Sequence, residues 1–314
     1  MDAKLLVLPT MTAQWPALPL AAWRETRETL HRYTQIVGKI QLALTPVVNH
    51  FWNVTLRVTA RGLATSALRC DEQTFDIELD LIEHRVVVRT SGGEHRDLEL
   101  RPLAVADFFR DLMAVLSTLG IDVAIWDHPV ELKTEAIPFS QDRVHAAYDR
   151  DAVRRFLQVL VSAQAVLDEF RARFIGKCSG VGFYWGTFDL SVARYCGRRV
   201  PGPVPKGVME REGYSHEVSE VGFWPGDAVY DAPAFFALHH PVPDGYASAT
   251  VRPPAASWHE RSRCFILPYD AAREHDTRAQ ILDFFQSTYE AGANLAQWDR
   301  AELERPRQGG HHAD

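Results

Sequence analysis

The sequence predicts an α+β protein in which helix-flanked antiparallel sheets, in two similar halves, form one compact unit. Several segments place apolar residues at three- and four-residue steps, which is the spacing of helices packed on a core. Other segments alternate between apolar and polar residues, which is the pattern of half-buried strands. Both kinds recur in the order helix, strands, helix, first over residues 1–143 and again over residues 144–304. Residues 305–314 have no periodic apolar face, and we expect this tail to be disordered.

The N-terminal half begins with a long helical pattern over residues 20–44, which Pro46 follows. Alternating patterns then predict strands near residues 54–58, 63–69, 75–81, 86–88 and 98–100. Gly92 and Gly93 are expected to form a two-residue hairpin turn before the last of these strands. A helix over residues 105–119, ended by Gly120, completes this half.

The C-terminal half follows a loop-like segment, residues 127–149, which is the best candidate for a boundary. A second long helix is expected to begin near Asp151 and to stop before Gly176, and the last helix opens with Thr277 and Gln280 in the spacing of a capping box. Strands are expected around residues 181–196, 214–224, 234–240 and 264–267. Two irregular segments, 197–213 and 241–261, interrupt this half. Loops of this length in a compact domain are usually functional lids or disordered.

Composition narrows the classes of function. The 314 residues carry 34 Lys and Arg against 41 Asp and Glu, and the isoelectric point is near 6.0. This acidic balance argues against a nucleic-acid-binding protein. No apolar run approaches the ~18 residues of a membrane span, and the N-terminus lacks a secretory signal, so we expect a cytoplasmic protein with no membrane partner. Four widely spaced cysteines indicate reduced thiols.

Three short motifs resemble known sites but lack the necessary context. The G-x-C-x-G around Cys178 follows a predicted helix and precedes a strand, whereas a nucleophile elbow requires strand, turn and helix in that order. His216 and Glu217 begin like a zinc protease motif, but Glu220 stands where the second histidine should be. The third motif is the acidic strand face formed by Asp76, Glu78 and Asp80, whose carboxylates could hold metal ions. A ladder of charges paired with Arg85 and Arg89 of the next strand is the simpler explanation. We therefore predict no metal site.

The strand that follows Trp185 offers the best candidate site. One of its faces carries small polar residues, including Asp189, where a solvated face would carry Lys, Arg or Glu. A glycine at position 186 could form a bulge that turns Trp185 to the other face. If this strand and the one after Tyr214 are neighbours, His216 could act as a general base oriented by Asp189 or Glu217.

The ligand-binding candidates are aromatic or histidine side chains near these strands: Trp185, Tyr214, Trp224, His50 and Trp52. In the alternative interpretation, His216 is a hydrogen-bonded core residue and the tryptophans only pack. Both interpretations remain open at the level of sequence.

Several segments, among them YWGTFDLSVARYCGRR (184–199) and YSHEVSEVGFWPG (214–226), resemble bacterial proteins catalogued as domain-of-unknown-function family 5996. The resemblance extends over nearly the whole chain, from LPLAAWRETRETL (18–30) to FFQSTYEAGANLAQWDR (284–300), and it favours one family unit over two independent domains. It implies no activity, cofactor or catalytic residue. We expect a protein that binds or modifies a small polar ligand in a Trp-, His- and Asp-lined pocket of its C-terminal half. The alternative is a non-catalytic protein–protein interaction or assembly protein.

Overall fold

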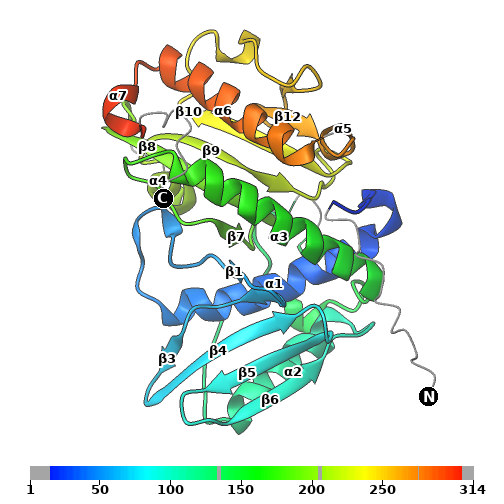
Figure 1. The fold of residues 1–314 in the computed structure, drawn as a ribbon. Coiled ribbons are helices and arrows are strands. Elements are labelled where there is room, and N and C mark those ends of the chain that lie inside the picture. Colours follow the sequence, from blue (N-terminus) through cyan, green and yellow to red (C-terminus); the bar gives the residue numbers. More distant parts are fainter. Residues whose placement is uncertain (1–14, 133–135, 204–206, 275, 306–314) are drawn as a thin grey trace, which may run out of the picture.

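The computed structural model describes residues 15–132, 136–203, 207–274 and 276–305. The described residues form two antiparallel sheets of six strands each, together with seven α-helices, which confirms the predicted α+β fold. Figure 1 shows the two sheets in separate halves of the molecule, with the helix α1 (Arg24–Leu44) passing between them. Among the described residues, no helix is both long and apolar enough to span a bilayer.

The first sheet is built from the N-terminal half. Its strand order is β1-β2-β4-β5-β6, and β3 pairs with the free part of β4. Its strands are β1 (Arg57–Val58), β2 (Gly62–Ala64), β3 (Leu68–Cys70), β4 (Gln73–Asp80), β5 (Arg85–Thr90) and β6 (His95–Glu99). The helix α2 (Val105–Thr118) follows, and the apolar side chains that alternate along β4 and β5 are buried beneath the helices.

The acidic face of β4 is paired with arginines, as the alternation predicts. Arg89 binds both Asp76 and Glu78, at 3.1 and 2.6 Å. Asp80 and Arg85 do not pair with each other, although they are opposite one another in the β4–β5 register. Asp80 pairs with Arg61, which directly precedes β2, and Arg85 pairs with Asp97 on β6. These carboxylates are therefore charge partners of arginines, and Glu78 and Asp80 are buried by the pairing.

The second sheet is a meander with the order β11-β12-β10-β9-β8-β7. Its strands are β7 (Gly182–Tyr184), β8 (Asp189–Arg199), β9 (His216–Trp224), β10 (Ala234–His240), β11 (Ser257–His259) and β12 (Cys264–Pro268). The long helices α3 (Arg150–Ala172) and α6 (Thr277–Leu295) lie side by side on one face of this sheet (Figure 1). The residues of β8 to β10 that point away from these helices form the opposite face.

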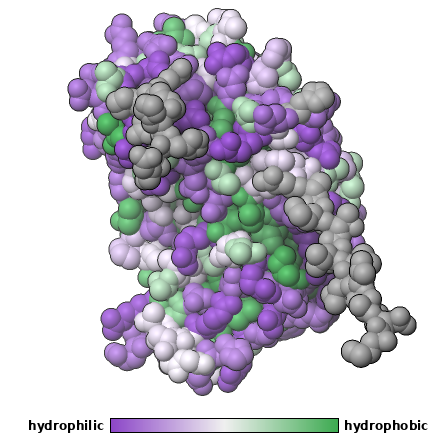
Figure 2. Space-filling model, viewed as in Figure 1, coloured by the Kyte–Doolittle hydropathy of each residue, from purple (hydrophilic) through white to green (hydrophobic). Residues whose placement is uncertain are grey.

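Short helices occupy the connections. They are α4 (Val208–Gly213), α5 (Tyr269–Ala272), α7 (Arg300–Leu303) and the 3-10 turns at Leu20–Ala22, Asn49–Phe51, Phe139–Gln141 and Tyr246–Ser248. The irregular segment 197–213 therefore contains α4. The irregular segment 241–261 contains the 3-10 turn at Tyr246–Ser248 and the strand β11. On the face shown in Figure 2, hydrophilic residues predominate and apolar ones gather near the middle.

Three local predictions need correction. The strand expected over residues 181–196 is broken, because the chain turns between β7 and β8 and Phe188 adopts a φ of 63°. Four residues, 91–94, connect β5 to β6, with Gly93 at a φ of 89°, instead of a two-residue turn. The cap of α6 is Asp276, whose carboxylate accepts from the amide of Ala279, so Thr277 is already helical.

The two halves share one continuous apolar core. Side chains of α1, α2, α3, α6 and both sheets belong to the same buried cluster. Leu56 and Phe183 also exchange two backbone hydrogen bonds, of 3.0 and 2.9 Å, which join the first sheet's leading segment to β7. Of the tail that we expect to be disordered, residues 306–314 lie outside the described part of the chain.

Candidate functional site

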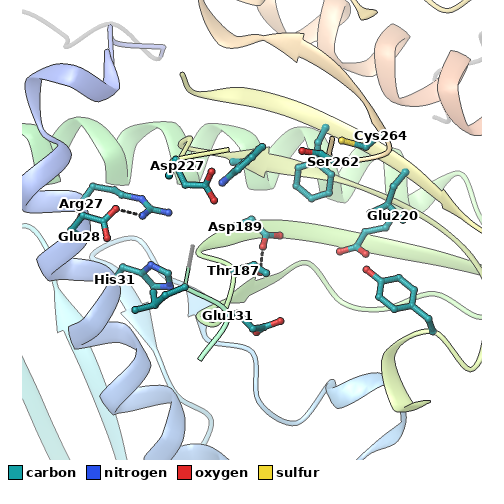
Figure 3. Close-up of a pocket in the computed structure, with 16 residues that line it drawn as sticks. Arg27, Glu28, His31, Glu131, Thr187, Asp189, Glu220, Asp227, Ser262 and Cys264 are labelled. Atoms are coloured by element: carbon teal, nitrogen blue, oxygen red, sulfur yellow. Dashed lines mark hydrogen bonds and ion pairs between the residues drawn. The ribbon is translucent and has the colours of Figure 1, made fainter. Parts of the chain in front are cut away.

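A cavity of about 230 Å³ lies between α1 and the face of the second sheet that α3 and α6 leave uncovered. Figure 3 shows that three side chains of α1, Arg27, Glu28 and His31, point toward Asp189 and Thr187 at the start of β8. Glu220 of β9 closes the far side. Pockets for drug-sized ligands usually have volumes of roughly 300 to 1,000 Å³, so this smaller cavity suits a molecule below that size.

The wall formed by α1 contains a carboxylate that is paired with arginines of the same helix. Arg27 donates from Nη1 to Glu28 at 2.6 Å, and Arg32 donates to the same carboxylate at 2.9 Å. Burial lowers the pKa of Arg27. Burial opposes the ionisation of Glu28, but the two guanidinium groups hold its pKa below the ordinary range. The pair is therefore ionised, and it contributes little net charge to the cavity.

His31 is a neutral imidazole on the same wall. Its Nε2 lies 3.0 Å from the carbonyl oxygens of both Trp185 and Gly186, so this nitrogen carries the hydrogen. Burial, reinforced by the charge of Arg27, lowers the pKa of His31 to about 3. Its Nδ1 is consequently an acceptor, and this atom has no hydrogen-bond partner within the described residues.

The sheet wall holds two carboxyl groups, those of Asp189 and Glu220. Asp189 is 7% exposed and accepts from the hydroxyl of Thr187, while Ser191 donates to Glu220 at 2.6 Å. Burial, together with the charge of Glu220, raises the pKa of Asp189 to about 8. Burial also raises the pKa of Glu220. At neutral pH the carboxyl group of Asp189 is therefore mostly protonated, and it can donate a hydrogen bond or give up a proton.

Aromatic side chains complete the lining. Tyr214, Trp224 and Phe236 lie around the carboxyl groups, and the rings of Trp224 and Tyr230 are 6.0 Å apart. Burial raises the pKa of Tyr214, so its hydroxyl stays protonated. Among the described residues, no three His, Cys, Asp or Glu side chains are grouped so as to hold a metal ion. The site thus combines polar groups with an apolar, aromatic surround.

A protein-family model described as Family of unknown function (DUF5996) matches residues 15–305. The chain belongs to this family. The match includes both halves of the fold and every side chain of the cavity described above. No curated protein and no solved structure matches the chain of this DUF5996 member.

The structure separates the three predicted catalytic residues of this DUF5996 protein. β8 and β9 are neighbours, as expected, but Asp189 begins β8 while His216 pairs with Arg199 at its other end. Glu217 points away from His216, and it binds Arg198 at 2.7 Å and Trp298 at 3.0 Å. Neither carboxylate therefore orients the imidazole, whose Nδ1 instead contacts Ser215 Oγ at 3.0 Å. A catalytic role for His216 remains a prediction.

The predicted ligand-binding residues fall into two groups. Tyr214 and Trp224 line the cavity. Trp185 lies behind the lining, where its indole donates to the carbonyl of Val54 at 2.7 Å and its own carbonyl lies within hydrogen-bonding distance of His31. His50 and Trp52 belong instead to a separate group with Tyr195 and His216 on the same sheet face.

We call this second group the His50 cluster; its members are His50, Trp52, Lys177, Tyr195 and His216. The rings of His50 and Tyr195 are stacked, with their centroids 4.3 Å apart. Lys177 donates to His50 Nε2 at 2.9 Å, and the opposite ring nitrogen lies near backbone carbonyls of α4. Burial lowers the pKa of both His50 and Lys177. These contacts fix α4 onto the sheet.

Sequence reasoning missed the α1 wall and Glu220. Arg27, His31 and Gln35 recur at four-residue steps along α1, which places three polar side chains on one stripe of a helix that is buried nearly all round. A polar stripe of this kind on a core helix is the signal that could have identified the wall. Glu220 could have been paired with Ser191 only if the register of β8 against β9 were known.

Proposed function

We propose that this protein binds, or binds and modifies, a small polar organic molecule in the cavity between α1 and the second sheet. The observation that carries the proposal is the placement of Asp189 and Glu220, two carboxyl-bearing side chains, in one cavity with aromatic walls. Burying a carboxyl group costs free energy, and a fold that needed only packing would place apolar side chains there. Carboxyl groups in such surroundings are typical of sites that bind or protonate a ligand.

The composition of the walls supports a ligand-binding role. Tyr214, Trp224 and Phe236 supply apolar contact area, while Asp189, Glu220 and His31 supply directional polar groups. This division, a largely apolar surface with few polar groups, is the usual composition of a small-molecule site. Asp189 can also serve as a proton donor, because its pKa of about 8 leaves it mostly protonated at neutral pH.

A cavity-blocking variant tests the proposal. Ala228 lines the cavity and is exposed, so Ala228→Trp should fill the cavity without disturbing the core. Polar metabolites are screened by thermal shift against the unmodified chain, the Ala228→Trp variant and a control variant, Ala301→Trp. Ala301 is exposed and does not line the cavity. A compound at 100 times its dissociation constant stabilises the fold by roughly 2.7 kcal/mol. We expect a stabilising compound whose effect Ala228→Trp abolishes and Ala301→Trp preserves. An equal shift in all three proteins would place the site elsewhere.

The alternative of an interaction protein has weaker support. Within the described residues, Trp126 is the only aromatic side chain among the large exposed hydrophobic ones, and Lys39 already lies 4.8 Å above its ring. A broad exposed aromatic patch would have favoured a docking surface.

A further inference from the structure

Two carboxyl groups of the cavity have no cationic partner among the residues that the structure describes. Asp189 is hydrogen-bonded by a threonine hydroxyl, and Glu220 by a serine hydroxyl. Glu28, on the opposite wall, is by contrast paired with two arginines. A buried carboxylate without a counter-ion is costly, so each group needs either a proton or a cation.

The remainder of the wall also offers acceptors to a ligand. His31 is 2% exposed and directed from α1 toward this cavity, with Nδ1 unpartnered among the described residues. Since Nε2 carries the hydrogen, Nδ1 bears a lone pair, which a ligand can reach only after a small side-chain movement because the atom is buried. The positive charge of Arg27 is balanced by Glu28 and faces Asp227 as well. The cavity therefore favours a molecule that brings both positive charge and N–H donors.

The aromatic walls suit the same kind of molecule. Trp224, Tyr214 and Phe236 border the two carboxyl groups. Aromatic faces attract organic cations through their quadrupole, and they also bury the hydrocarbon part of such a ligand. A bare metal ion would gain little from these rings, and the described residues contain no group of three metal-ligating side chains.

We propose that the ligand is a small organic cation, a primary amine or guanidinium with an apolar or aromatic body, and that Asp189 and Glu220 are its counter-ions. This inference rests on the proposed ligand-binding function and names the chemical class of its ligand. The cation takes the place of a proton, which leaves the carboxyl group for solvent as the ammonium or guanidinium group binds.

This exchange makes binding depend on pH. Burial and the charge of Glu220 keep Asp189 protonated up to a pKa of about 8, so a cation that needs the carboxylate must displace a proton at neutral pH. Affinity should therefore rise from pH 6 to pH 8. Other titratable groups face Asp189 and Glu220 from the surrounding elements. They are Tyr184 of β7, Tyr195 of β8, Cys264 of β12, Glu131 in the loop before α3, Arg27, Glu28 and His31 of α1, Tyr214 before β9 and Asp227 after it.

The test uses the full chain and matched pairs of probes. Benzylamine and phenethylamine are compared by isothermal titration calorimetry with benzyl alcohol and 2-phenylethanol, in two buffers of different ionisation enthalpy. We expect at least one cation to bind ten or more times more tightly than its hydroxyl counterpart. We also expect proton release on binding, and an affinity that rises up to about tenfold per pH unit between pH 6 and 7.

Substitutions locate the effect. Asp189→Asn and Glu220→Gln should each weaken the binding of the cation at least tenfold, while the exposed, non-lining Asp244→Asn should leave it unchanged. If a variant fails to fold, the probe pairs and the proton release on the unmodified chain still decide the question.

The failures of the two proposals are distinguishable. Binding of neutral compounds that Ala228→Trp abolishes, without binding of any amine or guanidine, would overturn the cation inference and leave ligand binding intact. Stabilisation by Mg²⁺, Ca²⁺ or Zn²⁺ that Asp189→Asn removes would also overturn it. If neither neutral nor cationic compounds bind, both proposals fall.

Discussion

Replacing Asp189 with asparagine should stabilise the protein, by an amount that grows with pH. Asparagine is nearly isosteric with the protonated carboxyl group, and its amide oxygen can accept from the hydroxyl of Thr187 as the carboxyl does. The unfolded chain loses the Asp189 proton near the ordinary pKa of 3.8, whereas the folded chain keeps it up to about 8. Between these two values the folded state binds more protons, so the free energy of unfolding falls as pH rises.

The magnitude follows from the difference between the two pKa values. Four pH units at about 1.4 kcal/mol each give an upper limit of roughly 6 kcal/mol at pH 8 and above. Relaxation of the cavity and its coupling to Glu220 will reduce this value. We therefore expect Asp189→Asn to gain a few kcal/mol at pH 8 relative to its effect at pH 4.

Urea denaturation at pH 4, 5, 6, 7 and 8 measures this difference directly. The stability of Asp189→Asn relative to the unmodified chain should increase steadily over this range, and Asp244→Asn should show no such trend. A difference between Asp189→Asn and the unmodified chain that is constant over the whole range would refute the argument that Asp189 is buried in its protonated form. Combined with the expected loss of cation binding, a gain in stability would show that the fold retains this carboxyl group for function.

Three further predictions concern the scaffold. Gly38→Ala should lower the free energy of unfolding by about 1 to 3 kcal/mol in urea, despite alanine's better helix propensity, because its Cβ would lie 2.3 Å from the ring of Trp185. Asp149→Ala should cost about 1 kcal/mol in the same assay, because the carboxylate caps α3 by accepting from two backbone amides; an unchanged midpoint would show that the cap is dispensable. Burial raises the pKa of Cys264 to about 12, so iodoacetamide at pH 8 should label this thiol slowly in the native protein and rapidly in guanidinium chloride, as followed by mass spectrometry; equal rates would contradict its burial.

The fold was more predictable than the site, because periodicity reports which side of an element is buried. The strand β10 has the bounds that its sequence predicts, and α1 ends at the expected Leu44. Gly186 indicated an irregularity between β7 and β8, but the full turn was not predicted, since the apolar–polar alternation continues through it. The turn is closed by a backbone hydrogen bond from Phe188 to Tyr184, which a side-chain pattern does not reveal.

Parts of the candidate site were predictable for a similar reason. Asp189 and Trp224 were identified because their strands carry unusual residues on one face, and both line the cavity. The distance between His216 and Asp189 depends on register, which a single sequence does not give. Arg27 and His31 were missed because charged residues on a helix normally face solvent, and only the packing of both halves around α1 buries them.

Because of the position of α1, a partly folded chain in which the two halves are not docked has no complete ligand cavity. One wall of the cavity comes from this N-terminal helix and the other from β8, β9 and β10, so neither half contains the site alone. A ligand in the cavity contacts residues almost 240 positions apart in the chain, from Arg27 to Cys264. Binding therefore reports that both halves have docked, and a bound molecule would oppose their separation more than it would oppose local opening of either half.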